Sequence, residues 1–441
     1  MTVADVTVAP FSEIDHRAQL RRAVIASTVG TTIEWYDFLL YGQMAALVFA
    51  KLYFPSSEPL TGTLQAFAVF AVGFVARPIG AAIFGHYGDR VGRKAVLIAT
   101  LLITGLATFA VGLVPTYETI GIWGAIILTA IRFIQGIGVG GEWGGSVLLS
   151  MEWARTNSHR GFVAAWPQFG APAGLLLANV AVLVFSRLSG DQFLVWGWRI
   201  PFLLSIVMAA VGLYIRLGIF ETPTFQRLLA EKRIEQVPVL EVIRRQPKEI
   251  ILSALSKTAE IAPAYIYLAF IFAYGAQVLH TPRDFLLSAV IAGCLLSFVV
   301  TPLSGYLSDR IGRKRMYILA AIAMGIFGFI YFAMLNSLVP VLIFLAIMLS
   351  FVVHGFLYGP QAALIAECFT PRLRYSGCSM GYHLAAVTGG GPAPLIATAL
   401  LARTGSGYAI AGYIALCAVV GIIATMLMPD RTNKDISQEH A

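Results

Sequence analysis

Two stretches of the chain are near copies of each other: GHYGDRVGRK at residues 85–94 and GYLSDRIGRK at residues 305–314. The matched residues are Gly85, Asp89, Arg90, Gly92, Arg93 and Lys94 in the first copy, and Gly305, Asp309, Arg310, Gly312, Arg313 and Lys314 in the second. All six pairs are separated by 220 residues (305 minus 85), which predicts a chain built from two related halves. The glycines permit close helix approach and tight turns, and the aspartate can pair with an arginine or lie at a helix N-terminus. We expect these loops to latch the halves together; the alternative is that they are only positively charged topology anchors.

The composition around these loops is that of a membrane protein. Of the 441 residues, 58% are apolar and only 12% are charged, and the mean hydropathy is +0.77. Soluble domains carry about twice this share of charge. Apolar runs near the roughly 20 residues that span a bilayer recur along the whole chain. We expect twelve membrane helices, at about residues 22–50, 62–84, 95–114, 120–150, 161–186, 197–218, 250–279, 285–307, 315–335, 338–366, 375–402 and 407–428.

The distribution of positive charge predicts the orientation. Most Lys and Arg residues lie at the two ends and in alternate loops, so both termini are expected to be cytoplasmic. The net charge of +8 is then an orientation signal near anionic lipid and does not require a nucleic-acid partner. The predicted organisation is a cytoplasmic tail (1–21), a six-helix bundle (22–219), a polar cytoplasmic linker (220–249), a second six-helix bundle (250–428) and a cytoplasmic tail (429–441).

Further stretches narrow the class: EWYDFLLYG (34–42), RFIQGIGVGGEWGG (132–145), WGWRIPF (196–202) and RYSG (374–377). Together with the doubled G-x-x-x-D-R-x-G-R-K loop, they resemble the metabolite:proton symporter family of the major facilitator superfamily, over nearly the whole chain. The resemblance implies an all-α membrane protein of twelve transmembrane helices in two pseudo-symmetric six-helix bundles. It also implies proton symport. It does not name the substrate, because members of the family carry dicarboxylates, tricarboxylates, shikimate-like acids, aromatic acids or zwitterionic osmolytes.

The resemblance and the predicted orientation imply a cellular location and a set of partners. We expect a multi-pass protein of the cell (inner) membrane that acts as a monomer and meets a small organic anion, protons and the lipid bilayer. A betaine- or proline-type osmolyte symporter is an alternative. Osmosensing relatives carry an extended C-terminal coiled coil, whereas only Pro429–Ala441 follows the last predicted helix here, which favours a metabolic cargo.

Ionisable groups inside membrane helices cost at least about 2.5–3.5 kcal/mol, so each one marks a candidate site. Glu34 and Asp37 lie one helical turn apart near the expected midplane, where two neighbouring carboxyl groups favour holding a proton. The resemblance also places an acidic residue of the first helix in the transport pathway. A permanent ion pair with an arginine is the alternative. His354 is a further candidate proton carrier, with hydrogen-bonded packing as its alternative.

Arg132 is the leading candidate for binding a substrate carboxylate, because its planar fork suits bidentate contact and keeps its charge. Its alternative role is to neutralise Glu34 or Asp37, and in our hypothesis protonation of either carboxyl group frees Arg132 for the cargo. Other predicted substrate-binding residues lie on polar helix faces: Gln135, Tyr41, Lys257, Glu260, Tyr267, Tyr358 and Gln361. For Lys257 and Glu260, a purely local ion pair is the alternative. Arg77 is expected near a helix end, in a structural role.

The predicted cytoplasmic gate joins the loop residues to two glutamates of the fourth helix. Its members are Gly85, Asp89, Arg90, Gly92, Arg93, Glu142, Glu152, Asp309, Arg310 and Arg313. We also expect Pro263 and the run Gly389–Pro392 to kink or break their helices.

Other classes of function find little support. We find no nucleophile–base set, phosphate loop or metal cluster, so no enzyme, cofactor or metal site is predicted. The four cysteines have no metal or redox spacing. A non-transporting membrane sensor would need an output domain, and the linker of about 30 residues is too short to be one.

Overall fold

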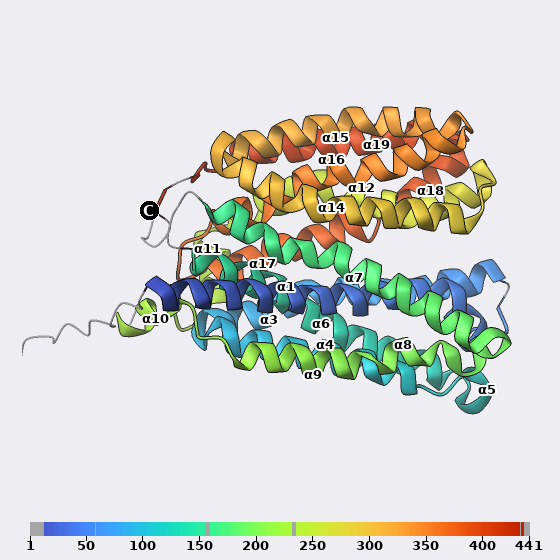
Figure 1. The fold of residues 1–441 in the computed structure, drawn as a ribbon, viewed down its shortest axis with the longest axis horizontal. Coiled ribbons are helices and arrows are strands. Elements are labelled where there is room, and N and C mark those ends of the chain that lie inside the picture. Colours follow the sequence, from blue (N-terminus) through green and yellow to red (C-terminus); the bar gives the residue numbers. More distant parts are fainter. Residues whose placement is uncertain (1–12, 58, 155–158, 232–234, 433, 436–441) are drawn as a thin grey trace, which may run out of the picture.

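The computed structural model describes residues 13–57, 59–154, 159–231, 235–432 and 434–435. Within these ranges every regular element is a helix, and the long helices lie side by side in two groups (Figure 1). The first group comprises α1 (Glu13–Met44), η1 (Ala45–Phe49), α2 (Ala50–Tyr53), α3 (Pro59–Arg90), α4 (Arg93–Leu113), α5 (Tyr117–Ile120), α6 (Trp123–Glu152), α7 (Arg160–Ser189), η3 (Gly190–Gln192), η4 (Phe193–Gly197), α8 (Arg199–Leu203) and α9 (Ser205–Leu217). We call this group the N half.

The C half repeats this plan. It comprises α12 (Pro247–Tyr265), η5 (Ile266–Phe270), α13 (Ile271–Tyr274), η6 (Gly275–Leu279), α14 (Arg283–Ile311), α15 (Arg313–Asn336), α16 (Pro340–Ala366), α17 (Arg374–Ala385), η7 (Ala386–Gly390), α18 (Ala393–Thr404) and α19 (Gly407–Leu427). Two short helices between the halves are α10 (Pro223–Ala230) and α11 (Pro238–Arg245). The start of α1, the short helices and the C-terminal segment all lie at one end of the bundle, which we call the terminal end (Figure 1).

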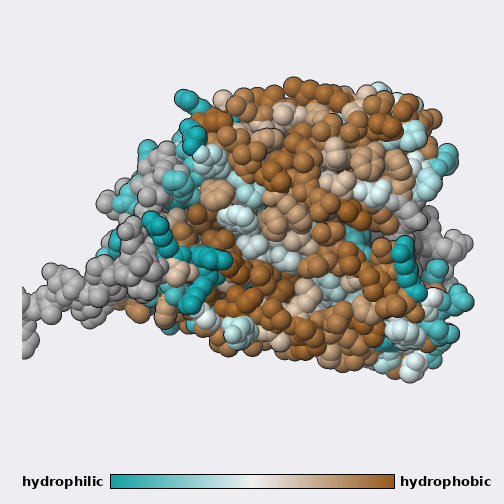
Figure 2. Space-filling view, viewed as in Figure 1, coloured by the Kyte–Doolittle hydropathy of each residue, from teal (hydrophilic) through white to brown (hydrophobic). Residues whose placement is uncertain are grey.

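The membrane prediction is confirmed by the helices and the surface. In the described residues, ten helical segments are long and apolar enough to cross a membrane. The two other long segments are α1 and the continuous run Pro247–Leu279, and both contain charged residues in their interior. These twelve match the expected number. Hydrophobic residues cover the flank of the bundle, while hydrophilic residues gather toward its two ends (Figure 2).

Helix boundaries differ from the expected ones where charged residues continue a helix beyond its apolar part. α1 begins at Glu13 rather than near residue 22, and α3 continues to Arg90 rather than ending near residue 84. The second difference matters for the site, because Arg77 lies twelve residues before Asp89, about 18 Å along the helix. Arg77 is therefore deep in the bundle and not near a helix end.

The expected helix breaks are present. Three residues after Pro263, α12 gives way to the π-helical turn η5. Gly389 and Gly390 lie in the π-helical turn η7, after which α18 begins at Ala393. A proline removes a backbone donor from the helix, and π-turns of this kind often mark functional positions.

Candidate functional site

The first repeated loop contacts the C half through its aspartate. The Asp89 carboxylate, at the end of α3, accepts hydrogen bonds from the backbone N–H groups of Tyr375 (3.2 Å) and Ser376 (2.9 Å), at the start of α17. An anion at a helix N-terminus is favoured by the unpaired N–H groups and the helix dipole. Arg93 lies 3.5 Å from both Asp89 and Glu152. Glu152 in turn lies 3.6 Å from Arg374 of the C half. We call Asp89, Arg93, Glu152 and Arg374 the first latch.

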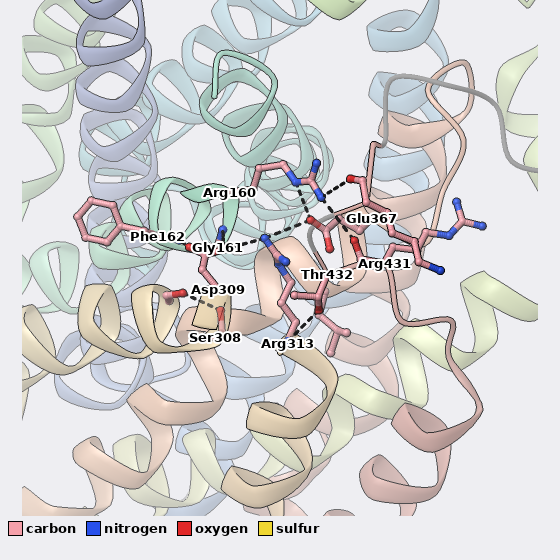
Figure 3. Close-up of polar contacts among 12 residues, drawn as sticks. Arg160, Gly161, Phe162, Ser308, Asp309, Arg313, Glu367, Arg431 and Thr432 are labelled. Carbon is pink, nitrogen blue, oxygen red and sulfur yellow. Dashed lines mark hydrogen bonds and ion pairs between the residues drawn. The ribbon is translucent and has the colours of Figure 1, made fainter. Parts of the chain in front are cut away.

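The second loop makes the equivalent contact with the N half, with the roles of the two halves exchanged (Figure 3). The Asp309 carboxylate accepts hydrogen bonds from the backbone N–H groups of Gly161 (2.8 Å) and Phe162 (2.9 Å), at the start of α7. Arg313 lies 2.8 Å from Asp309 and 3.3 Å from Glu367. Glu367 lies 2.9 Å from Arg160 of the N half. We call Asp309, Arg313, Glu367 and Arg160 the second latch.

The glycines of both loops do what the motif predicts. A Cβ at Gly85 would lie 2.7 Å from the Cα of Ser376, and one at Gly305 would lie 2.5 Å from the Cβ of Ala165, so both helices approach the other half at van der Waals limits. Gly92 and Gly312 have φ values of +120° and +99°, which few side-chain-bearing residues adopt. These conformations turn the chain sharply between helices, as expected.

The lysines and the segments around the loops complete the two latches. The Lys94 ammonium donates to the carbonyl of Leu217, and that of Lys314 donates to the carbonyls of Met426 and Met428, so each lysine caps the last helix of its half. After each left-handed glycine a side-chain oxygen accepts a backbone N–H: Glu221 accepts from Lys94 (3.0 Å), and Thr432 accepts from Arg313 (3.0 Å).

The sequence predicted five of these eight latch residues. It named Asp89, Arg93, Glu152, Asp309 and Arg313 but missed Arg160, Glu367 and Arg374. A signal was available, because Glu152 and Glu367 both end long apolar helices, and an arginine begins the next helix in each half. Glu367 lies outside the membrane segments, and burial raises its pKa above the ordinary value although Arg313 and Arg160 favour its charged form.

Three other residues predicted for the gate lie elsewhere. Arg90 and Arg310 are exposed at the helix ends. Glu142 is buried within the N half, where it pairs with Arg216 and accepts a hydrogen bond from Thr100 at 2.8 Å. Among the described residues, none of the three therefore forms an ion pair between the halves.

A cavity lies between the two halves, deeper in the bundle than the latches. The space between its lining residues, together with the part open to solvent, is about 800 Å³. Both halves supply its wall, which is mostly apolar and aromatic: Trp35, Leu39, Arg77, Ala171, Pro172, Leu175, Lys257, Glu260, Ile261, Ala264, Tyr265, Tyr267, Leu268, Ser297, Thr301, Ser350, Phe351, His354, Tyr358 and Tyr382.

A chain of polar contacts runs along the C-half wall. The Lys257 ammonium lies 2.7 Å from Glu260 and donates to Gln361 at 3.0 Å. Glu260 is also 2.7 Å from the Nε2 atom of His354, whose ring stacks on Tyr358. The predicted residues Lys257, Glu260, His354 and Tyr358 thus meet at the cavity, with Gln361 behind Lys257. Tyr267 also lines the cavity.

Rings from both halves lie beside this polar chain, near the Lys257 ammonium. The Trp143 and Tyr382 rings stack with their centroids 3.7 Å apart, and the Lys257 ammonium lies 3.7 Å from the Tyr382 centroid. The Trp143 indole donates to Gln168, whose amide donates to the carbonyl of Tyr358 in the C half. Aromatic contacts therefore join the halves beside the cavity.

The leading sequence candidates of the N half lie behind the cavity wall. Arg132 is fully buried between α3 and α6, against the rings of Phe38, Tyr41 and Phe70. It donates to Gln135, while its Nε and Nη2 atoms have no hydrogen-bond partner among the described residues. A Cβ at Gly73 would lie 2.7 Å from Arg132, so this glycine makes room for it.

The acidic pair of α1 is buried in the same wall. Asp37 is fully buried and neither of its carboxylate oxygens has a hydrogen-bond partner among the described residues. Glu34 is 6% exposed, and its Oε2 atom likewise lacks a partner there. Between them along α1, Trp35 faces the cavity instead. The structure therefore places Glu34, Asp37, Tyr41, Arg132 and Gln135 outside the cavity lining.

Two matched halves, latched at one end, with a charged cavity between them, are the architecture of a membrane transporter that opens its site alternately to the two sides. The chain belongs to the Major Facilitator Superfamily, whose family model matches residues 28–375 and 288–440. It is 39% identical to the shikimate transporter of Escherichia coli (strain K12) over 94% of this chain and 95% of that protein. It is 36% identical to the inner membrane metabolite transport protein YhjE of the same strain, over 94% and 95%.

More distant relatives extend the comparison. The proline/betaine transporter of Escherichia coli (strain K12) is 32% identical over 99% of this chain and 87% of that protein. Among solved structures, the proton:xylose symporter XylE bound to 6-bromo-6-deoxy-D-glucose has the same fold, with a TM-score of 0.77 at 17% identity over 96% and 98% of the two chains. The protein is therefore a multi-pass membrane transporter of small molecules and not an enzyme.

Proposed function

We propose that the protein is a proton-coupled symporter that imports a small carboxylate-bearing metabolite by alternating access. In this proposal it acts as a monomer in the cell inner membrane, with the terminal end facing the cytoplasm as the positive loops predict. Residues 22–219 and 250–428 rock as units, and the two latches close the cytoplasmic side. The observation that carries the proposal is the cavity between the halves, whose apolar wall contains Arg77, Lys257, Glu260 and His354.

Proton coupling is supported by the unpaired state of Asp37 and Arg132. A charged carboxylate buried without a partner is costly, and binding a proton removes that cost. Arg132 lies within electrostatic range of Asp37. We propose that deprotonated Asp37 pairs with Arg132 and that protonated Asp37 releases it. The pair thereby links proton binding to the packing of α1 against α6, with Glu34 one turn away and His354 in the cavity as the other candidate proton carriers.

The cargo is proposed to be an acid because cations face the cavity and because a shikimate transporter is 39% identical to this chain. A zwitterionic osmolyte is the second candidate, supported by the proline/betaine relative and by the aromatic rings around the cavity, which can bind a quaternary ammonium. Glu260 argues against it, since its carboxylate is already engaged by Lys257 and His354 and is not free for a cargo cation.

Uptake into proteoliposomes under an imposed inward proton gradient tests the proposal. The labelled cargoes are shikimate and glycine betaine, each with and without a protonophore. We expect gradient-driven accumulation of the acid. Asp37→Asn should abolish that accumulation while labelled acid still exchanges across the membrane without a gradient. If Asp37→Asn and Glu34→Gln proteins both still accumulate the acid, coupling through the carboxyl groups of α1 is wrong.

A further inference from the structure

Arg77 is the cation that the N half presents to the cavity. It lies near the middle of α3, is 3% exposed and forms part of the cavity wall. Its guanidinium carbon is 4.1 Å from the ring centroid of Phe38 and 4.8 Å from that of Phe74. The two rings fix the direction of the side chain, and Tyr265 of the C half lies close enough to interact with it.

The charge of Arg77 has no carboxylate partner among the described residues. No ion pair to it is formed there, and its buried Nε atom has no hydrogen-bond partner. A guanidinium stays charged in any protein environment, so burial without an anion is costly. An unpaired buried arginine that faces a cavity is therefore prepared to receive an anion from it.

Two other buried cations in or beside the cavity wall do not fill this role. Lys257 faces the same cavity, but Glu260 and Gln361 already engage its ammonium. Arg132 is unpaired on two atoms, but it lies behind the wall against three aromatic rings. Within the cavity wall of the described chain, Arg77 is the cation that remains available to a ligand.

The charges of the wall also limit the charge of the ligand. Arg77 and Lys257 contribute two positive charges and Glu260 one negative charge, which leaves +1 when His354 is counted as neutral. A ligand with a single negative charge balances this sum, whereas a dicarboxylate or tricarboxylate leaves charge unpaired in an apolar enclosure. The ring-rich remainder of the wall, including Trp35 and Tyr265, suits a compact ligand body with an apolar face.

We propose that Arg77 binds the carboxylate of the cargo and that the cavity selects organic acids with one carboxylate. This inference rests on the proposed function and assigns its substrate class and its anion-binding residue. The planar fork of Arg77 makes two parallel hydrogen bonds to the carboxylate oxygens, while the Lys257–Glu260–His354 chain lies across the cavity as the facing wall.

Binding to the purified full chain in detergent tests the charge class. The shift of the thermal unfolding midpoint is followed over a concentration series of each probe: shikimate, benzoate and lactate with one carboxylate, succinate and citrate with more, and glycine betaine as the zwitterion. At least one monocarboxylate is expected to stabilise the protein at a lower concentration than any other probe. Stabilisation by none of the monocarboxylates, or preferential stabilisation by succinate, citrate or betaine, overturns the proposal.

Variants of Arg77 test the residue. Arg77→Gln should weaken the best monocarboxylate at least about 30-fold, because a buried charge pair loses one partner. Arg77→Lys should weaken it less, since it keeps the charge but loses the fork. The matched control is Arg187→Gln, an exposed arginine of α7, which should bind as the wild type does. Equal affinity of Arg77→Gln and wild type, or of Arg77→Lys and wild type if Arg77→Gln does not fold, overturns the assignment.

One further variant separates ligand binding from charge neutralisation within the protein. Glu34 lies within electrostatic range of Arg77. If Arg77 only neutralised Glu34, the double variant Arg77→Gln with Glu34→Gln would regain wild-type affinity; we expect it to bind as weakly as Arg77→Gln alone. The two proposals can be refuted independently. A wild-type protein that binds the acid but shows no gradient-driven uptake contradicts symport, whereas wild-type affinity of Arg77→Gln contradicts the assignment of Arg77 as the anion-binding residue.

Discussion

The Asp89 carboxylate accepts a hydrogen bond at 2.9 Å from the backbone N–H of Ser376, which joins residues of opposite halves. The same contact recurs in the opposite direction, from Asp309 to the start of α7. Each half therefore supplies a carboxylate to a helix N-terminus of the other half, and each also supplies a glutamate to an arginine of the other. Both crossed contacts must break before the terminal end can open.

We expect Asp89→Asn to weaken the first latch. The amide keeps the size of the side chain but loses the charge that the α17 N-terminus favours, at a cost of about 1.5–3 kcal/mol. The equilibrium constant for opening of the terminal end should then increase at least about 10-fold. Cys378 of α17 is fully buried next to this latch, so its labelling by a maleimide, located by mass spectrometry, reports the opening.

The control for this prediction is Asp191→Asn, which changes an exposed aspartate in η3. It should leave the labelling rate of Cys378 unchanged. A Cys378 rate in Asp89→Asn that equals the wild-type rate would show that the hydrogen bonds to Tyr375 and Ser376 do not hold the terminal end closed.

The two turn glycines form a matched pair for a second prediction. Alanine at Gly312 meets no atom within 4 Å and carries only the strain of its positive φ, about 1–3 kcal/mol. Alanine at Gly92 carries the same kind of strain, and its Cβ would also lie 2.3 Å from the Glu221 carboxylate that accepts from Lys94. Gly92→Ala should therefore lower the thermal unfolding midpoint further than Gly312→Ala. Equal midpoints, or the reverse order, would contradict the role given to Glu221.

Variants of the Lys257–Glu260 pair test whether this pair in the cavity wall is only structural or also serves transport. Glu260→Gln and Lys257→Gln should each destabilise the protein by about 3–5 kcal/mol, because each leaves a buried charge without its partner. The double variant should recover much of the unfolding midpoint. If the pair serves transport, uptake stays low in the double variant; recovered uptake together with recovered stability would leave the pair a structural element only.

The fold could be predicted from sequence because its determinants are local. Every membrane segment must satisfy its own backbone hydrogen bonds, so long apolar runs become helices, and the doubled loop reveals the repeat. The contacts of Asp89 and of the turn glycines followed from residue type in the same way. The pairing of Glu152 with Arg374 and of Glu367 with Arg160 did not, because each pair joins opposite halves. The local pattern marks charged residues at the helix ends but does not say which of them meet.

The same limit explains why the sequence pointed to Arg132 as the cation of the cavity, whereas the structure places Arg77 there. Both arginines are deep in apolar helices, and their sequence surroundings do not say which one faces a cavity. The position of Gly73 determines which arginine faces the cavity. The space beside this glycine holds Arg132 between α3 and α6, whereas Arg77 lies one turn further along α3 and faces the C half. The predicted end of the helix near residue 84 also placed Arg77 too close to the surface, because charged residues that continue a helix lower its local hydropathy.

The C-terminal segment after α19 contacts the second latch at two of its residues, Arg313 and Arg160. Thr432 accepts a hydrogen bond from the backbone N–H of Arg313 (Figure 3). Arg160 donates to the carbonyl of Lys434 at 2.8 Å. Removing residues 430–441 should therefore loosen the second latch alone. Thr432→Val, which removes only the hydroxyl acceptor, should have the same effect to a smaller degree.

Cys368 reports this opening, because it follows Glu367 directly and is 1% exposed. Burial raises the pKa of Cys368 to about 12, so at pH 8 almost none of it is the reactive thiolate. When the latch opens and water reaches the thiol, its pKa returns toward about 8.5 and labelling accelerates. We expect the truncated protein to label Cys368 several-fold faster at pH 8 while Cys378 keeps its rate. Glu221→Gln, at the matching turn of the first latch, should accelerate Cys378 instead. Unchanged labelling of Cys368 after truncation would mean that Asp309, Arg313, Glu367 and Arg160 hold the second latch without the C-terminal segment.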